Sequence, residues 1–334
     1  MTSDTPFVHS QFAHCESGVV STLLSSYGLK MSEPMAFGTT STLNFVYLPI
    51  VKINGLPLIA YRSLPKNIIN TISKVFKIDM AKKTFSNQED ANNELKRLVE
   101  KEHKFVGLQT SVFYLPYFPK DMRFHFNAHN LLVYGTKDGQ YLISDPVFEH
   151  PVVCNEKDLN KARFAKGAFA PNGFLYYPKI IPANIDFSDV IKKAIIKNAK
   201  SMLTPFPFAG VKGMRRLANR IKSLDNKPEN QRYNKNFLTN IVRMQEEIGT
   251  GGGGFRFLYA AFLEEAKNYD LNNEILEEAS ILIIQSGNAL RKFALYCVEG
   301  SKKIDTLDTN KIASKLTEAS NYEEKAFRLL KMIK

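Results

Sequence analysis

One cysteine stands where its surroundings can change its reactivity. Cys15 lies in the stretch FAHCESGVVSTLLSSYG, directly before apolar residues at three- and four-residue spacing. This spacing predicts a helix that ends near Gly28. A thiol in the first turn of a helix faces unpaired amides and the positive end of the helix dipole, and both favour the thiolate. Cys15 is therefore a candidate nucleophile, with a buried, inert thiol as the alternative.

A histidine and an acid suited to such a nucleophile follow more than a hundred residues later. HNLLVYGTKDGQYLISDP has the pattern of two strands joined by a tight turn, with His129 opening the first and Asp145 closing the second. Adjacent antiparallel strands would set the carboxylate beside the imidazole, where it orients the ring and stabilises its protonated form. The alternatives are a strand histidine bonded to a backbone carbonyl and an aspartate that only forms a turn.

The remaining histidines and cysteines fit this scheme less well. His125 is a rival base, but it lies four residues earlier in a more polar stretch. His14 is adjacent to the candidate nucleophile, and adjacent side chains diverge. Cys154 and Cys297 lack a matched partner and are interpreted as structural thiols. Three widely spaced cysteines form no disulfide framework, which is typical of a reducing compartment.

The patterns that position these residues divide the chain near residue 180. Before it, short β-rich runs alternate with turns, and two helical stretches interrupt them, one after Cys15 and one at NQEDANNELKRLVEK. The expected strands lie in TLNFVYLPI, PLIAYRSL, KFVGLQTSVFYLPYF, HNLLVYG, QYLISDP, HPVVC and GFLYYP. After Pro182, six long segments carry apolar residues at three- and four-residue spacing, which predicts six helices. We expect an α+β domain with an antiparallel sheet over residues 1–182 and an all-α domain over residues 183–334.

The formal net charge of +12 is the strongest feature of the composition. A basic protein attracts nucleic acid, anionic membranes or acidic proteins. The chain has no zinc-finger spacing, RNA-recognition signature or glycine–lysine phosphate loop, which disfavours nucleic acid. It has no apolar run long enough for a transmembrane segment, and its start, MTSDTPFVHS, lacks a secretory pattern. These features predict a cytoplasmic protein.

Several motifs together resemble a known family. A cysteine at the head of an early helix, a histidine opening a later strand and an acid on the next strand follow the chain order of papain-like folds. HCESGVVSTLLSSYGLKMSEPMAFG resembles the N-terminal domain of the butirosin-biosynthesis acyltransferase family, in its HC-S start, its helix end and its SE…FG element. HNLLVYG and ISDP fit that family's histidine and acid segments. IGTGGGGFRFLYAAFLEEA resembles the glycine-rich start of the domain that commonly follows.

The resemblance implies a papain-like catalytic domain and an acyltransferase activity. An acyl group would move from the phosphopantetheine thioester of an acidic acyl carrier protein to a small-molecule amine or alcohol. Cys15 would form the acyl-enzyme, His129 would take the acceptor's proton, and Asp145 would hold the ring. No bound cofactor is expected, since phosphopantetheine arrives on the carrier. Relatives occur in specialised metabolism, including aminoglycoside side-chain attachment and ester formation in aryl-polyene and dialkylresorcinol pigment pathways.

The tetrahedral intermediate of such a reaction needs oxyanion donors. The backbone N–H of Cys15 is one candidate, and the side chain of Gln11 is another. Papain-like enzymes use a glutamine further upstream, where this chain has His9, so the second donor stays open between these two residues.

Two basic or glycine-rich segments have candidate binding roles. VKGMRRLANRIK has one apolar helical face, which leaves a set of cations outside it as a candidate docking surface for the carrier, with a solvated helix face as the alternative. These cations are Lys212, Arg215, Arg216 and Arg220. GTGGGGF invites a phosphate site but lacks the lysine and hydroxyl of a nucleotide loop, which favours a connection packed close to the first domain. Glu33 and Gly38, in the SE…FG element, are expected to shape the turn below the helix of Cys15.

Two other functions use the same residues. A cysteine peptidase or a thioester or amide hydrolase would share the nucleophile, base and orienter, and would differ only in passing the acyl group to water. A non-catalytic binding module with this fold is the third alternative.

Overall fold

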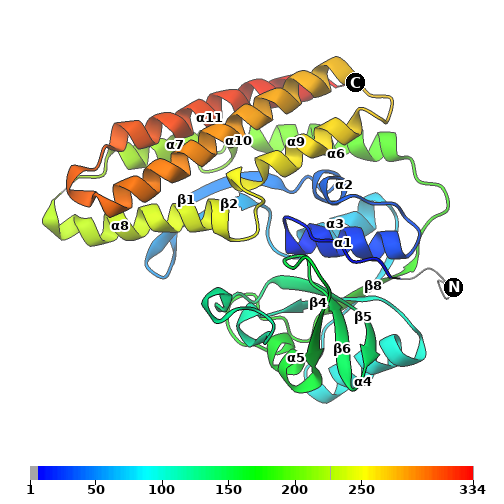
Figure 1. Cartoon of the computed structure of the whole chain (residues 1–334). Coiled ribbons are helices and arrows are strands. Elements are labelled where there is room, and N and C mark those ends of the chain that lie inside the picture. The colour runs from blue at the N-terminus through cyan, green and yellow to red at the C-terminus, as the bar shows by residue number, and fades with distance from the viewer. Residues whose placement is uncertain (1–6, 226, 334) are drawn as a thin grey trace. The chain divides into compact units, whose positions relative to one another are not determined.

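The structure is a computed structural model that describes residues 7–225 and 227–333. The chain forms two compact units (Figure 1). The first unit contains the residues up to Ala36 together with Pro65–Ile185, and the second contains Phe37–Leu64 and the residues from Asp186 onward. The first unit holds the candidate nucleophile, histidine and acid, whereas the second is mainly helical.

The first unit is built on a six-stranded sheet in the order β3-β8-β4-β5-β6-β7, with every neighbouring pair antiparallel. Its strands are β3 (Asp79–Lys83), β4 (Val106–Thr110), β5 (His129–Lys137), β6 (Gln140–Ser144), β7 (Val152–Asn155) and β8 (Leu175–Ile180). Asp138 and Gly139 join β5 to β6 at positive φ, as the sequence TKDGQ predicts. The antiparallel sheet and the α+β class expected from the sequence are confirmed.

Several helices accompany this sheet in the sequence. They are α1 (Cys15–Ser26), α2 (Glu33–Gly38, which ends in the second unit), α3 (Asn67–Val75), α4 (Gln88–Lys96, continued by η1, Arg97–Lys101) and α5 (Glu156–Arg163). The first helix contacts β4 and β5, and its residues 15–24 are all buried (Figure 1). The carboxylate of Glu16, in the first turn of α1, accepts a 2.9 Å hydrogen bond from the backbone N–H of Ile68, which lies in the first turn of α3. Gly28 follows α1 at φ +90, which confirms the predicted helix end.

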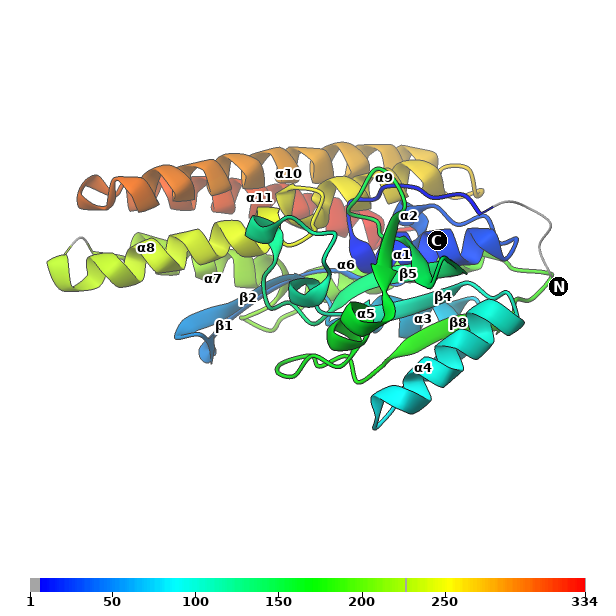
Figure 2. The same ribbon diagram turned by 60° about the horizontal axis from the view of Figure 1, so that its bottom comes forward.

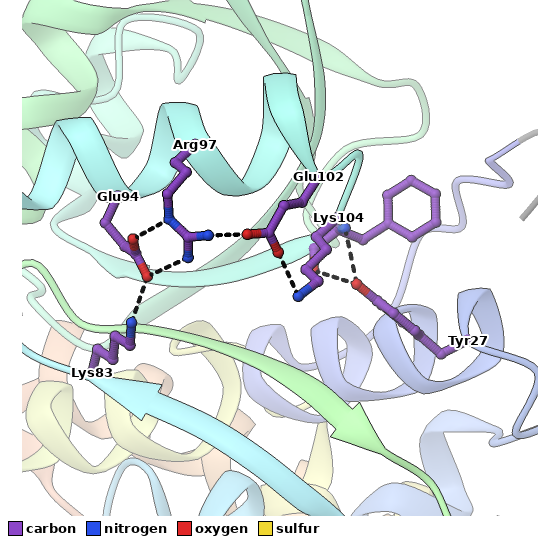
Figure 3. A network of polar contacts seen from close by, with 7 residues as sticks. Tyr27, Lys83, Glu94, Arg97, Glu102 and Lys104 are labelled. Carbon is purple, nitrogen blue, oxygen red and sulfur yellow. Dashed lines mark hydrogen bonds and ion pairs between the residues drawn. The ribbon is translucent and has the colours of Figure 1, made fainter. Parts of the chain in front are cut away.

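An ion-pair network on the surface of the first unit ties α4 to its surroundings (Figure 3). Glu94 bonds Lys83 of β3 and Arg97 of η1, and Arg97 also bonds Glu102. Glu102 in turn pairs with Lys104 at 2.6 Å. Glu94 thus links α4 to β3, which pairs with β8 in the sheet (Figure 2).

The second unit consists of helices and one hairpin. The helices are α6 (Phe187–Met202), α7 (Gly210–Lys222), α8 (Pro228–Val242, continued by η4, Arg243–Glu247), α9 (Arg256–Ala266), α10 (Asn273–Lys302) and α11 (Thr309–Leu330). The hairpin is formed by β1 (Leu43–Ile53) and β2 (Leu56–Arg62). The long helices α10 and α11 run side by side (Figure 1, Figure 2). All six helical segments expected after Pro182 are present.

The hairpin is where the structure differs from the expected division at residue 182. Residues 37–64 carry two of the strands assigned to the first domain, but they pack in the second unit. Asn198 of α6 donates to the carbonyl of Leu43 at 2.9 Å, and Tyr61 donates to Gln245 at 3.0 Å. These partners lie far along the chain, and the local strand pattern therefore cannot reveal them.

A buried ion pair lies at the centre of the second unit. The guanidinium of Arg256 and the carboxylate of Glu323 are both fully buried and form a bidentate pair with N···O distances of 2.8 and 3.0 Å. Ser286 of α10 donates to the same carboxylate at 2.6 Å, and Arg256 also donates to the carbonyl of Gly254. The pair therefore joins α9, α10 and α11 in one hydrogen-bonded arrangement.

Some elements were not anticipated. The strand β3 and the helices α2, α3 and α5 had no predicted counterpart, and only Val106–Thr110 of the long run KFVGLQTSVFYLPYF forms a strand. Among the described residues, no helix is long and apolar enough to cross a membrane.

Candidate active site

Cys15 occupies the first position of α1, as the sequence predicts. His14 precedes it in an extended conformation and caps the helix, with its side chain accepting the N–H of Ser17. Cys15 is buried, and its Sγ lies 4.0 Å from the carbonyl of Ala128, directly before His129. The thiol is thus at a helix N-terminus and at the start of β5 at once.

The backbone that leads into Cys15 is held in place by a buried carboxylate. Glu33 accepts the N–H groups of Ala13 and His14, at 3.0 and 2.8 Å, and the hydroxyl of Ser17 at 3.0 Å. Burial raises the pKa of Glu33, and these hydrogen bonds oppose that effect. The turn-shaping role expected of Glu33 therefore takes a defined form, because its carboxylate fixes the residues on both sides of the nucleophile.

His129 and Asp145 are directly bonded. Nε2 of His129 lies 2.7 Å from Oδ2 of Asp145, and both side chains are buried. Residue 129 opens β5, and residue 145 directly follows the last residue of β6, its antiparallel neighbour. The hairpin thus brings together two residues that are 16 positions apart.

The imidazole is also coupled to the thiol. Burial disfavours the charged form of His129, but the charge of Asp145 and its hydrogen bond outweigh burial, and the hydrogen bond and charge of Cys15 add to them. Together they raise the pKa of His129 to about 10. Since Nε2 is bonded to Asp145, Nδ1 is the ring nitrogen left for the thiol. The thiol of Cys15 thus affects the charge of the imidazole, which is hydrogen-bonded to Asp145.

Asp145 has further donors that keep its carboxylate fixed. The phenol of Tyr117 donates to Oδ2 at 2.9 Å, and the backbone N–H of Val147 donates to Oδ1 at 3.1 Å. Burial and then the charge of Asp145 raise the pKa of Tyr117 well above its usual value, so the phenol keeps its proton and donates. The ring of Phe118 packs edge-on against His129, with centroids 5.5 Å apart. No pattern in the sequence singles out Tyr117, because it is one of several aromatic residues in its loop.

The two side chains considered as second oxyanion donors have other partners. Gln11 is exposed, and its amide donates to the carbonyl of Val147 at 3.0 Å. His9 lies 2.7 Å from the hydroxyl of Ser144 through Nδ1 and 3.0 Å from the carbonyl of Phe148 through Nε2. Because a carbonyl only accepts, Nε2 must carry the proton, and that donor is already used.

The same contacts give Gln11 and His9 a different role from the one expected. With the N–H of Phe12, which donates to the carbonyl of Pro146, they fasten residues 9–12 to residues 144–148. This attachment sets the segment before Cys15 against the one that carries Asp145. The backbone N–H of Cys15 has no hydrogen-bond acceptor among the described residues and is the available oxyanion donor.

The rival histidine and the two remaining thiols have different surroundings. His125, the rival base, is exposed and stacks on the ring of Phe113 with centroids 4.0 Å apart. Cys154 and Cys297 are both buried, and burial raises the pKa of each thiol, that of Cys154 to about 12. Among the described residues, no group of acids, histidines and cysteines is arranged to hold a metal ion.

The basic helix α7 has the predicted apolar face, but its cations differ in their partners. Arg215 bonds Glu324 and Asn321 of α11. Lys212 and Arg216 are exposed, and Arg220 donates to Ser223 at 3.2 Å. Arg215 is thus bound to a neighbouring helix of the second unit.

The glycine-rich segment is not arranged as a phosphate site. The N–H of Gly253 donates to the carboxylate of Glu246 at 3.1 Å, so an internal anion takes the place that a phosphate would need. A side chain at Gly254 would lie 2.4 Å from the ring of Tyr61, because this glycine packs directly on β2. The segment packs on a part of the chain that was assigned to the first domain but belongs to the second unit.

Comparisons with known proteins match two parts of the chain. Residues 14–146 match the family model described as butirosin biosynthesis protein H, N-terminal. Residues 157–330, more than half of the chain, match a model described as a domain of unknown function (DUF4872). A crystal structure of a C39-like peptidase from Bacillus anthracis aligns with a TM-score of 0.37 and 14% identity, covering 54% of this chain and 97% of the peptidase. No curated protein matches the chain.

Proposed function

The chain belongs to the DUF4872 family and its residues 14–146 are similar to butirosin biosynthesis protein H, N-terminal, and we propose that it is an acyltransferase acting through a Cys15 acyl-enzyme. The acyl donor is the phosphopantetheine thioester of an acidic carrier protein, and the acceptor is a small-molecule amine or alcohol. One observation supports the proposal most: His129 is hydrogen-bonded to Asp145, and the thiol of Cys15, at the N-terminus of α1, lies 4.0 Å from the carbonyl of the residue before His129.

The first half-reaction loads the enzyme. The thiolate of Cys15 attacks the thioester carbonyl, forming a carbon–sulfur bond and an oxyanion that the Cys15 N–H stabilises. Collapse of this intermediate breaks the bond between the carbonyl carbon and the pantetheine sulfur. The imidazolium of His129 gives its proton to the departing thiolate, which leaves as a thiol.

The second half-reaction transfers the acyl group. Neutral His129 takes the proton of the acceptor's amine or hydroxyl as that group attacks the Cys15 thioester. Collapse breaks the bond to Sγ and restores the thiolate beside an imidazolium. Asp145 stays ionised throughout, and its bond to Nε2 keeps Nδ1 directed at the reacting groups.

The raised pKa of His129 supports this cycle. A ring whose protonated form is stabilised by Asp145 and Cys15 favours the thiolate–imidazolium pair in the resting enzyme. The backbone N–H of Cys15, which has no acceptor among the described residues, supports an oxyanion site with at least one donor.

Intact-protein mass spectrometry tests the proposal. Wild-type protein and the Cys15→Ala variant are each incubated with acyl-pantetheine thioesters carrying short, long and aromatic acyl groups. The proposal expects an acyl adduct on the wild type only. A panel of amines and alcohols is then added, and loss of the adduct must coincide with an acylated acceptor. Loss of the adduct to the free acid alone, with every acceptor, would instead indicate a hydrolase, and the absence of any adduct would indicate a non-catalytic module.

A further inference from the structure

The positive charge of the protein is concentrated in one segment of the second unit. Residues 190–224, which cover most of α6, the following loop and α7, contain nine lysine and arginine residues and no aspartate or glutamate. The nine are Lys192, Lys193, Lys197, Lys200, Lys212, Arg215, Arg216, Arg220 and Lys222. The formal net charge of the whole chain is +12, so this short segment accounts for most of the excess.

The two basic helices meet at a close junction. Gly210, the first residue of α7, has φ +56, and a Cβ there would lie 2.1 Å from the carbonyl oxygen of Met202, the last residue of α6. The end of one helix therefore abuts the start of the next. Lys200 and Lys212, both exposed, lie two residues to either side of this contact.

An exposed aromatic ring lies in the loop between them. Phe206 is 51% exposed, and its ring packs against that of Phe208 with centroids 5.4 Å apart. The guanidinium of Arg216 lies over the ring of Phe208 at 4.2 Å, and Nζ of Lys212 is 3.4 Å from the carbonyl of Pro205. We call Phe206, Phe208, Lys212 and Arg216 the junction patch. Aromatic and arginine side chains are enriched at protein interfaces, and the junction patch combines an exposed ring with two exposed cations.

We propose that the junction patch is the docking surface for the acidic carrier protein. This inference rests on the proposed function, which requires such a partner to deliver its thioester. The cations would attract the carboxylates of the carrier and raise the encounter rate, while Phe206 would be covered by an apolar side chain at the centre of the contact. Arg215 has no part in docking, since it is already paired with Glu324.

Charge reversal tests the surface. In the Lys212→Glu/Arg216→Glu variant, KM for an acyl-carrier substrate is expected to rise about 10-fold with little change in kcat. Acylation by the same acyl group on free pantetheine should stay within about twofold of the wild type, because that donor needs no docking. Phe206→Ala should also raise KM for the carrier, by a smaller factor. A higher salt concentration should raise the wild-type KM for the carrier. The difference in KM between the wild type and the charge-reversed variant should therefore become smaller.

A matched control reverses two charges elsewhere on the same unit. Lys235 of α8 and Lys292 of α10 are exposed, and Lys235→Glu/Lys292→Glu changes the net charge by the same amount. Its KM for the carrier should stay close to the wild-type value. Equal effects of the two double variants, or an unchanged KM in Lys212→Glu/Arg216→Glu, would overturn the proposal.

Binding separates this inference from the proposed function. Should free acyl-pantetheine fail to acylate Cys15, the enzymatic proposal falls, whereas calorimetric binding of the carrier to wild type and variants still decides the docking surface. Single-stranded RNA also binds aromatic rings flanked by cations, so it is titrated in parallel. Binding of RNA but not of the carrier at the junction patch would contradict the inference.

Discussion

The Nε2–H of His129 donates a 2.7 Å hydrogen bond to Oδ2 of Asp145, and the same carboxylate oxygen accepts the hydroxyl of Tyr117 at 2.9 Å. All three groups lie in the first unit. The carboxylate is satisfied by two side chains and the Val147 backbone before any substrate arrives. This pre-formed arrangement makes the orientation of the ring independent of substrate binding.

Replacing Asp145 by asparagine should disable the histidine while keeping the fold. The amide is of similar size but uncharged, so the pKa of His129 should fall and its tautomer is no longer fixed. We expect acyl transfer to slow by about 10²- to 10⁴-fold, measured as kcat/KM across pH. Asp158→Asn, on α5, is the control and should leave the rate unchanged. Wild-type activity in Asp145→Asn would exclude Asp145 as the orienting group.

Tyr117→Phe tests the hydroxyl that supports Asp145. The loss of one donor should lower the free energy of unfolding by about 1–3 kcal/mol, because the buried carboxylate of Asp145 then accepts one hydrogen bond fewer.

Tyr141→Phe is a matched comparison for this change. The hydroxyl of Tyr141 is buried with no hydrogen-bond partner among the described residues, so its removal should leave stability unchanged or raise it. Equal losses of stability in the two variants, measured by urea denaturation, would show that the bond to Asp145 contributes nothing.

Glu33→Ala should shift the backbone that positions Cys15, although the substitution leaves Cys15 itself unchanged. The variant leaves two backbone N–H groups and the Ser17 hydroxyl without their buried acceptor, and we expect a loss of about 2–4 kcal/mol in stability. Glu33→Gln retains one acceptor oxygen and should fold better. Both should acylate more slowly than wild type, and the rate of adduct formation by folded protein measures this. An unchanged rate in both variants would assign Glu33 a purely structural role.

The stability of the first unit should carry an acid-sensitive contribution from Glu94. Its hydrogen bond with Arg97, opposed by burial and reinforced by Lys83, lowers the pKa of Glu94 to about 2. Because the folded-state pKa lies below the unfolded value, this stabilisation is present above about pH 4.5 and is lost as the pH falls toward 2. Glu94→Gln should cost about 1 kcal/mol or less at pH 7 and nothing near pH 2. Glu149→Gln, in an exposed loop, should show no such pH dependence, and denaturation at both pH values compares them.

The parts of the site that the sequence could predict are those with a local signature. Apolar spacing after Cys15 and the glycine at position 28 define the helix and hence the position of the thiol. The strand pattern around the Asp138–Gly139 turn defines the hairpin that pairs His129 with Asp145. In both cases a short segment contains the whole signal.

The parts that were missed depend on distant partners. Tyr117 and Asp145, which are hydrogen-bonded, lie 28 residues apart in the sequence. The hydrogen bonds of Glu33 to the backbone of residues 13 and 14 join segments that precede and follow α1. Burial alternates along β2 and the first half of β1, as in any strand with one face covered, yet their partners include Asn198 and Gln245. The spacing of apolar residues along a strand predicts that one of its faces is buried. It does not predict which element covers that face, because tertiary packing determines this.

The reactivity of Cys15 toward iodoacetamide at pH 6, followed by mass spectrometry, tests the thiolate–imidazolium pair most directly. The wild-type thiol should be alkylated at least about 10-fold faster than that of His129→Ala, while Cys154 and Cys297 stay unmodified in both proteins as internal controls. Equal alkylation rates of Cys15 with and without the imidazole would contradict the account.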